Sequence, residues 1–389
     1  MHDNKNFIPL SIPHIGGNEK KYLNKCIEDN WVSTAGPYVQ SFENSFAKFV
    51  GSKYAVACSS GTSALHLSLV SLGIGEGDIV LVSNLTFIAT VNAIKYTGAE
   101  PILVDCDLNS WQMNVQYIKS FLEKECINKK DSCFYKKSGK KISAIIPAHI
   151  LGHACDIIDL VKLTNEYNIP IVEDAAEALG VKVNEKHIGN FGVLGCFSFN
   201  GNKIITTGSG GMIVTNSLKL AKKVKFLSEQ AKQPGNNYIH KEVGYNYRMS
   251  NIHAAIGLAQ LENIEHHINK KILIAKTYIK ELSKIKGISW INPIYSSKSS
   301  WWLFTILFNK KYIKSSLKKI QNELLNNRIE SRLIWQPMNL SKPYKNSIYI
   351  GENNSKKIYN SSLSLPSSVS LKKKDQYRVI YALKNILGV

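Results

Sequence analysis

A single lysine lies in a glycine-rich turn between two apolar stretches of the sequence. The turn runs from Ser198 to Gly211 and carries Lys203 among small and polar residues. The apolar stretches 193–199 and 212–214 predict strands that hold the turn at both ends. A primary amine on fixed backbone can act as a nucleophile or transfer protons, although a lysine in such a loop more often has no chemical role.

Two adjacent carboxylates upstream strengthen the case for chemistry. Glu173 and Asp174 follow the apolar stretch 169–172, which predicts a buried strand. Side chains at the carboxyl end of a parallel strand point into the crevice where open α/β sheets bind ligands. A helix N-cap for the residues 175–179 is an equally natural role for this pair.

A third candidate feature is the small-residue segment Ser59 to Leu65. It lies between a predicted strand and a predicted helix, so backbone N–H groups at the helix start could bind an anion. Its serine and threonine could instead serve only as helix caps. The segment matches neither a Walker loop nor a G-x-G-x-x-G fingerprint, which argues against a nucleotide-binding fold.

Two other polar clusters resemble metal sites. Asp105 and Asp107 form a D-x-D after a predicted strand, and His149 and His153 have i, i+4 spacing in a segment that contains Gly152. Short carboxylate spacings are common at strand ends, and the histidine segment is expected to be a loop. We therefore predict no metal site.

Together the three main features supply an amine, a carboxylate and an anion-binding helix start. These are the groups that a pyridoxal phosphate enzyme needs. The lysine forms a Schiff base, the carboxylate keeps the pyridine nitrogen protonated, and the helix start holds the phosphate.

The elements that must position these groups alternate along the chain. After an extended N-terminal arm, short apolar strands alternate with helices, which predicts an α/β fold with a mostly parallel sheet covered on both faces. A long helical stretch, 252–285, then leads to a smaller α+β region. We therefore expect a large domain over 1–251 and a small domain over 252–389. The lysine-rich segment 134–141 is expected to be a solvated loop.

Composition limits the partners and the compartment. The 389 residues carry a formal net charge of +20, but lysine is abundant everywhere and no basic stripe stands out, so no nucleic-acid partner is predicted. The seven cysteines are scattered without a C-x-x-C pair, which predicts reduced thiols in the cytoplasm. No apolar signal region or stretch of about 20 apolar residues is visible, so no membrane association is expected.

The order and spacing of several motifs resemble one enzyme family over nearly the whole length. The motifs are Gly36-Pro37 with Phe42-Glu43, Ser60 to Leu65, Thr86 to Thr90, Glu173 to Gly180, Ser198 to Gly211, and Gly244 to Met249. The chain resembles the sugar aminotransferases of the DegT/DnrJ/EryC1/StrS group. This resemblance implies the aspartate-aminotransferase type of the pyridoxal phosphate-dependent transferase fold.

The resemblance also implies roles for single residues. Lys203 would bind pyridoxal 5′-phosphate and shuttle the proton, Asp174 would pair with the pyridine nitrogen, and Phe87 would stack on the ring. Asn246 would reach in from the second subunit of a homodimer with shared active sites. The residues expected at the phosphate are Gly61, Thr62, Ser63 and Ser198.

Two positions depart from the family pattern. Glu177 stands where many members carry a glutamine near the cofactor's 3-hydroxyl, so its protonation and its partner are open. Ser209 replaces the glutamate of a G-E-G-G sequence, which affects the sub-family and not the chemistry. Lys203 itself favours transamination, because members that dehydrate sugars replace this lysine, typically with histidine.

The expected reaction moves an amino group from L-glutamate, through the pyridoxamine phosphate form, to a nucleotide-linked ketosugar. The residues 200–207 look most like enzymes that aminate C4 of 4-keto-6-deoxy sugars. A UDP-linked N-acetylated sugar is the first expectation, and the GDP-linked precursor of perosamine is the alternative. Ser33 and Thr34 in the early loop, and the residues from Arg332 to Pro337 late in the chain, are expected substrate contacts.

Two other classes of function remain open at the level of sequence. A glycosyltransferase or dehydrogenase could use the same α/β architecture, but it would depend on a metal or a nicotinamide. A pyridoxal phosphate-binding regulator without turnover could use the same scaffold, although no basic helix-turn-helix is visible. Release of 2-oxoglutarate from glutamate would separate the enzyme from the regulator.

Overall fold

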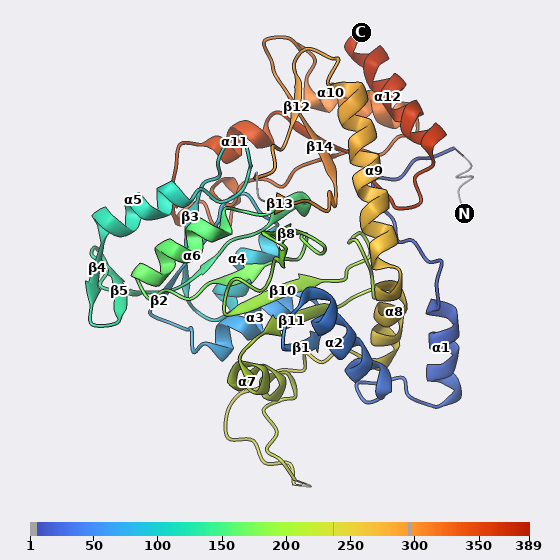
Figure 1. Ribbon diagram of the computed structural model, residues 1–389. Coiled ribbons are helices and arrows are strands. Elements are labelled where there is room, and N and C mark those ends of the chain that lie inside the picture. The colour runs from blue at the N-terminus through green and yellow to red at the C-terminus, as the bar shows by residue number, and fades with distance from the viewer. Residues whose placement is uncertain (1–5, 236, 295–296) are drawn as a thin grey trace.

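A computed structural model describes residues 6–235, 237–294 and 297–389 of the chain. Its centre is a large mixed sheet in the order β1-β11-β10-β7, continued through a bridge between Ile171 and Ile145 to β6-β2-β3-β16 (Figure 1). The strands of this sheet are β1 (Tyr54–Cys58), β2 (Asp78–Ser83), β3 (Glu100–Val104), β6 (Lys141–Ile146), β7 (Val172–Asp174), β10 (Leu194–Ser198), β11 (Gly211–Thr215) and β16 (Ile348–Ile350).

Most neighbouring strands of this sheet are parallel. The pairs β10–β7, β2–β3, β2–β6 and β16–β3 run in the same direction. Strand β11 runs antiparallel to both of its neighbours, β1 and β10. The predicted α/β class with a mostly parallel sheet is therefore confirmed.

Helices cover both faces of the large sheet because its strands are apolar on both sides. Along β2, Ile79 and Leu81 belong to one buried cluster, and Val80 and Val82 belong to the other. The helices packed on the sheet are α2 (Pro37–Val50), α3 (Gly61–Ser71), α4 (Ile88–Tyr96), α5 (Val115–Glu125), α6 (Ile157–Glu166) and α7 (Leu218–Ser228).

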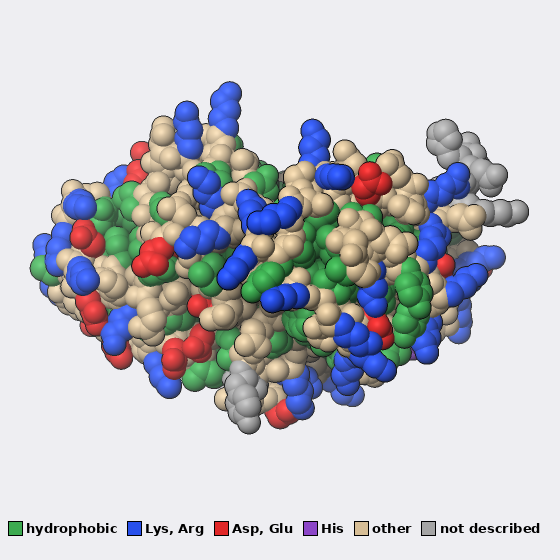
Figure 2. Space-filling view, turned by 90° about the horizontal axis from the view of Figure 1, so that it is seen from above, with side chains coloured by type: hydrophobic (Ala, Val, Ile, Leu, Met, Phe, Trp, Pro, Cys, Tyr) green, Lys and Arg blue, Asp and Glu red, His purple; other side chains and the backbone are tan. Residues whose placement is uncertain are grey.

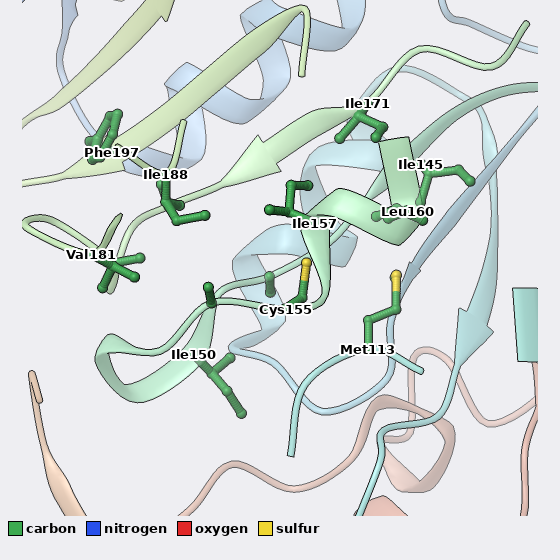
Figure 3. Packing of buried hydrophobic residues seen from close by; sticks show 14 of the residues in the cluster. Met113, Ile145, Ile150, Cys155, Ile157, Leu160, Ile171, Val181, Ile188 and Phe197 are labelled. Carbon is green, nitrogen blue, oxygen red and sulfur yellow. The ribbon is translucent and has the colours of Figure 1, made fainter. Parts of the chain in front are cut away.

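Different helices cover the two faces of the large sheet. Helices α2, α5 and α6 contribute to the first cluster, and α3, α4 and α7 to the second. Figure 3 shows part of the first cluster, where Ile157 and Leu160 of α6 gather with Ile145 of β6. Every strand end that carries a candidate site residue is therefore fixed by packing on both sides.

The C-terminal part adds a second sheet, in the order β12-β14-β17-β15, with a third apolar cluster. Its strands are β12 (Ile288–Trp290), β14 (Phe304–Phe308), β15 (Arg332–Leu333) and β17 (Ser362–Leu365). Its helices are α8 (Asn251–Glu262), α9 (Ile264–Leu282), α10 (Leu317–Asn326), α11 (Asn354–Tyr359) and α12 (Lys373–Leu387). Because β16 returns to pair with β3 of the large sheet, the two parts are joined by more than α8 and α9. The boundary at 251/252 stays a prediction.

The N-terminal arm connects the parts further. Residues 1–5 of the predicted arm lie outside the described residues; Ile8 forms a bridge with Ile329, and Ser11 donates a hydrogen bond to the carbonyl of Asn202. Helix α1 (Glu19–Glu28) follows the arm. The remaining elements are β4 (Cys126–Lys129), β5 (Ser132–Tyr135), β8 (Lys182–Val183), β9 (Lys186–His187), β13 (Ser297–Lys298) and two 3-10 turns, Ile150–Gly152 and Met338–Leu340.

Two details of the prediction were wrong. The stretch 252–285 is two helices that break at Asn263, whose backbone leaves the helical region and whose side chain is a poor helix former. The segment 134–141 is not all a solvated loop, because it begins within β5. Tyr135 is buried there against Phe121, with 5.4 Å between the ring centroids.

The basic side chains do not gather into one stripe on the face that Figure 2 shows. Lysines and arginines are scattered among acidic, apolar and other polar side chains over the whole outline. In the described part of the chain, no helix combines the length and the apolarity that crossing a bilayer requires.

Candidate active site

The turn between β10 and β11 places Lys203 on a fixed backbone. The N–H of Phe199 donates to the carbonyl of Gly210, and the N–H of Thr207 donates to the carbonyl of Phe199, so the turn closes on itself. The N–H of Lys203 donates to the carbonyl of Asn200. The side chain of Lys203 then lines a cavity of about 260 Å³ at the carboxyl ends of the parallel strands.

Lys203 has two close neighbours within this cavity. Its Nζ lies 3.4 Å from Oε1 of Glu177 and 4.1 Å from the centre of the Trp302 ring. The lysine side chain is 13% exposed, so both contacts are largely shielded from water. A cation above an indole ring and beside a carboxylate is stabilised by both.

Glu177 is held in place by backbone as well as by Lys203. Its Oε2 accepts a hydrogen bond of 3.0 Å from the N–H of Leu151. Burial raises the pKa of Glu177 to about 6, and the positive charge of Lys203 limits that rise. The carboxyl group of Glu177 therefore faces the lysine amine.

Glu173 and Asp174 point to opposite sides of β7, as successive residues of a strand must. Asp174 lines the cavity. Its Oδ2 accepts a hydrogen bond of 2.7 Å from the hydroxyl of Thr90, and its Oδ1 accepts one of 3.1 Å from the N–H of Ala176. Asp174 is therefore an acceptor held in a fixed position at the cavity wall.

Glu173 is a buried structural anchor. It accepts hydrogen bonds from the N–H groups of Gly189, Phe191 and Gly192, and His149 lies 3.2 Å away. Burial alone would raise the pKa of Glu173, but these hydrogen bonds and the histidine outweigh it and hold the pKa below its usual value. The local pattern alone does not tell which member of the pair faces the site; the family resemblance named Asp174, and Asp174 is the one that lines the cavity.

The other polar clusters have structural partners. His149 accepts the N–H of Cys155 and contacts Glu173, and His153 lies beside the hydroxyl of Ser299. Asp105 is fully buried and accepts N–H donors at the start of α11 and the hydroxyl of Tyr349. Across the described ranges no group of three or more potential ligands could hold a metal ion.

The start of α3 forms a cradle of backbone N–H groups. Gly61, Thr62 and Ser198 line the cavity there. A Cβ atom at Gly61 would lie 2.8 Å from Cβ of Ser198, so glycine is required for this close approach. Ser63 instead turns its hydroxyl to Ser60 in a capping box, away from the cavity lining.

An exposed aromatic ring completes the cavity wall. Phe87 precedes α4, lines the cavity and is 54% exposed, which is unusual for phenylalanine beside a buried site. Its ring offers an apolar surface that a planar ligand would cover.

The predicted substrate and partner residues fall in different places. Arg332 lines the cavity, although its guanidinium also contacts Glu330 at 3.1 Å. Thr34 lines a separate hollow beside Glu43, and the carbonyl of Ser33 accepts the N–H of Asn251. Asn246 is exposed and lies outside the cavity lining of its own chain.

Trp302 and Thr90 line the cavity and were not predicted as site residues, whereas Trp335 lies within the predicted range 332–337. Trp302 and Trp335 lie nearly parallel, with interplanar angle 8° and 6.3 Å between ring centroids, and Thr90 holds Asp174. The adjacent pair Trp301-Trp302, directly before an apolar strand, was a usable signal in the sequence. Tryptophan is rare in this chain, which contains six. Thr90 lies within a family motif, but the motif does not show that Thr90 bonds Asp174, because that contact depends on how α4 packs on β7.

The cavity residues fit pyridoxal 5′-phosphate. The backbone at Gly61 and Thr62, at the start of α3 beside Ser198, suits a phosphate, the exposed face of Phe87 suits an aromatic ring, and Asp174 suits a protonated ring nitrogen. The amine of Lys203 faces the same space. This fit rests on the donors and acceptors of the described chain alone.

The chain is similar to known proteins over most of its length. The chain is 41% identical over 341 residues to the GDP-perosamine synthase of Escherichia coli O157:H7, covering 87% of each chain. It is 34% identical over 381 residues to the GDP-perosamine synthase of Caulobacter vibrioides, covering 98% of each. Among solved structures, a DegT DnrJ EryC1 StrS aminotransferase from Brucella abortus superposes with a TM-score of 0.87 at 26% identity, over 96% of both chains.

These similarities confirm the fold expected from the motifs, the pyridoxal phosphate-dependent transferase fold. A family model matches residues 13–384, which is nearly the full chain. Enzymes of this family use pyridoxal 5′-phosphate to transfer amino groups. The chain belongs to the DegT/DnrJ/EryC1/StrS aminotransferase family.

Proposed function

We propose that the protein moves an amino group from L-glutamate to C4 of a nucleotide-linked 4-keto-6-deoxy hexose. The observation that carries the proposal is the position of the Lys203 amine. It lies in the same cavity as the Asp174 carboxylate and the cradle at the start of α3. Few other reactions require these three groups around one space.

Each cavity residue has a defined task in this proposal. When bound, pyridoxal 5′-phosphate supplies an electron sink for the carbon that loses a proton. Asp174, fixed by Thr90, holds the protonated ring nitrogen, and Phe87 covers one face of the ring. The N–H groups at the start of α3, with Thr62 and Ser198, bind the phosphate.

Lys203 is the proton-transfer group. Its Nζ takes a proton from the amino donor and returns one to the amino acceptor, which is general acid–base catalysis by a positioned amine. The carboxylate of Glu177 lies 3.4 Å from the Lys203 ammonium and stabilises its charge. The ring of Trp302 shields one side of the ammonium from water. Both neighbours keep the amine directed into the cavity.

The identity of the nucleotide sugar rests on the relatives. GDP-perosamine synthases at 41% and 34% identity support GDP-4-keto-6-deoxymannose ahead of the UDP-linked N-acetylated sugar. A panel of UDP-, GDP- and dTDP-linked 3- and 4-ketosugars with L-glutamate, read by product mass, tests the choice. We expect aminated product with the GDP-linked 4-ketosugar. Turnover of a 3-ketosugar alone would contradict the proposal.

Arg332 is the candidate contact for the anionic part of the sugar nucleotide. Lys203 and Arg332 are the two lysine or arginine side chains among the described residues that line the cavity. Replacing Arg332 with glutamine should raise KM for the nucleotide sugar by roughly 10-fold, because a charged hydrogen bond is lost. The KM for the nucleotide sugar should change, whereas the rate of the half-reaction with L-glutamate alone should not.

We also propose a homodimer in which Asn246 completes the partner's site. The segment that carries Asn246 projects from the body of the fold below α7 (Figure 1), and Tyr238 and Val243 in it are 85% and 79% exposed. Exposed apolar side chains on a projecting segment favour contact with another chain. Ser33 and Thr34, which lie outside the cavity of their own chain, are candidates for the same shared site.

Mixed dimers test this arrangement. Lys203→Ala and Asn246→Ala proteins are each expected to be weakly active, and a mixture that exchanges subunits should recover activity. The recovery follows because one site of the mixed dimer combines an intact Lys203 with an intact Asn246 from the partner chain. Absence of recovery in dimers shown to be mixed would place Asn246 in the site of its own chain.

The proposal places the reaction in the cytoplasm. All seven cysteines are free and buried, and thiols remain reduced in that compartment. Oxidation of these thiols would require the chain to open, because none is exposed.

A further inference from the structure

Lys271 is a buried lysine that the reaction described above does not use. It lies in the middle of α9, and it is 2% exposed. No carboxylate of the described residues forms an ion pair with it, and burial lowers its pKa to about 7. Placing an amine in such surroundings is costly, so the hydrogen bonds that it makes there must offset the cost.

Those hydrogen bonds go to two backbone carbonyl groups. Lys271 Nζ donates to the carbonyl of Trp302 at 2.9 Å and to the carbonyl of Ser367 at 2.8 Å. The two acceptors are 65 residues apart in the chain and lie just before β14 and just after β17. An ammonium has three N–H donors and a neutral amine has two, so both bonds persist whichever form is present.

Trp302 connects Lys271 to the turn that carries Lys203. Its indole N–H donates to the carbonyl of Asn202 at 2.7 Å, directly before Lys203 in the chain. Its ring lies 4.1 Å from Lys203 Nζ and nearly parallel to Trp335. Trp302 is therefore held at its backbone by Lys271, at its indole nitrogen by the turn, and on its face by Trp335.

The same segment also meets the loop that holds Glu177. A Cβ atom at Gly152 would lie 2.4 Å from the nitrogen of Trp302, and the N–H of Ser300 donates to the carbonyl of Gly152. Trp301 has a φ of 52°, which is unfavourable for a bulky residue and persists only where its surroundings enforce it. The neighbouring Leu151 donates its N–H to Glu177, so displacement of Trp302 would disturb both neighbours of Lys203.

We propose that Lys271 is a positioning residue for the transfer reaction, acting through Trp302. By fixing the Trp302 carbonyl it sets the place of the indole, and the indole sets the place of the Lys203 amine and of the turn. The inference rests on the proposed role of Lys203. It assigns no contact between Lys271 and any substrate or cofactor.

Three variants of the full-length holoenzyme test this inference. Lys271→Met keeps an unbranched side chain of similar length and removes the N–H donors. Trp302→Phe keeps an aromatic ring and removes the indole N–H. Lys276→Met is the matched control, because Lys276 is exposed on the same helix and loses the same charge.

The readouts are the visible absorbance of the bound cofactor as a function of pH and the first-order rate of its change with saturating L-glutamate. We expect the pH midpoint to shift by about half a pH unit or more, in the same direction, for Lys271→Met and Trp302→Phe. The rate should fall by roughly 10-fold or more, because small displacements of reacting groups have such effects. KM for L-glutamate should change by less than about 2-fold, and Lys276→Met should match the wild type.

An unchanged pH midpoint and rate in Lys271→Met, or in Trp302→Phe, would overturn the inference. If Lys271→Met yields no folded protein, Trp302→Phe decides, because the inference requires its spectrum and its rate to change. Borohydride labelling of the wild type separates this outcome from a failure of the proposed function. A label on Lys203 with an unaffected Trp302→Phe rejects only the positioning role, whereas a label elsewhere rejects the function itself.

Discussion

Replacing Glu177 with glutamine should change how the stability of the cofactor-free protein depends on pH. The pKa of Glu177 is raised from an ordinary value of 4.5 to about 6. A carboxyl group with a raised pKa binds its proton more tightly in the folded chain than in the unfolded chain. Its contribution to stability is therefore fully present below 4.5 and is lost as the pH rises through about 6.

The size of this effect follows from the two pKa values. One pKa unit corresponds to about 1.4 kcal/mol, so the full contribution is about 2 kcal/mol, and about 1 kcal/mol of it falls between about pH 5 and about pH 7.5. Solvent screening reduces this little, because the Glu177 side chain is 7% exposed. Glutamine keeps the shape and can still accept the N–H of Leu151, but it cannot ionise.

Urea unfolding of wild type and Glu177→Gln at these two pH values measures the difference. The free energy of unfolding of the wild type should gain about 1 kcal/mol relative to the variant on going from the higher to the lower pH. Glu166→Gln, an exposed carboxyl at the end of α6, is the control and should run parallel to the wild type. Parallel profiles for Glu177→Gln and wild type would refute the argument that burial raises this pKa.

Three further substitutions have defined outcomes. Gly61→Ala should weaken cofactor binding by roughly 10-fold in a fluorescence titration, because the added Cβ would press on Ser198 in the cradle. Unchanged affinity would show that the cradle does not bind the cofactor. Thr90→Val should lower the melting temperature of the cofactor-free protein by an amount equivalent to about 1–3 kcal/mol, because Asp174 loses a buried donor; no change would show that the bond is not formed. Asp105→Ala should lower the free energy of unfolding in urea by about 3–5 kcal/mol, because it leaves the N–H groups at the start of α11 without their acceptor. A loss under about 1 kcal/mol would contradict the anchoring role of Asp105.

Local sequence signals were sufficient for the fold and for the centre of the site. Helix α2 follows from its apolar period and from Pro37 at its start. The apolar runs before Asp174 and before Ser198 predict strands, and both strands place those residues at the cavity. These features depend on residues close together in the chain, which a sequence displays directly.

What the sequence did not reveal depends on contacts between distant segments. The local pattern does not distinguish Glu173 from Asp174: the family resemblance named Asp174, and the orientation of β7 explains why Glu173 lies in the core and Asp174 at the cavity. Trp302 contacts Lys203, 99 residues earlier in the chain, and Lys271 of α9 donates to the carbonyl of Trp302. Ser63 stands in a phosphate-binding motif, yet its hydroxyl satisfies the helix cap.

The most direct test of the central claim, that Lys203 carries the chemistry, is borohydride reduction of the purified holoenzyme followed by peptide mapping. We predict loss of the visible absorbance and a stable cofactor adduct on Lys203, absent from Lys203→Ala protein. An adduct on another lysine, or a Lys203→Ala protein that still forms 2-oxoglutarate from L-glutamate at the wild-type rate, would contradict the account.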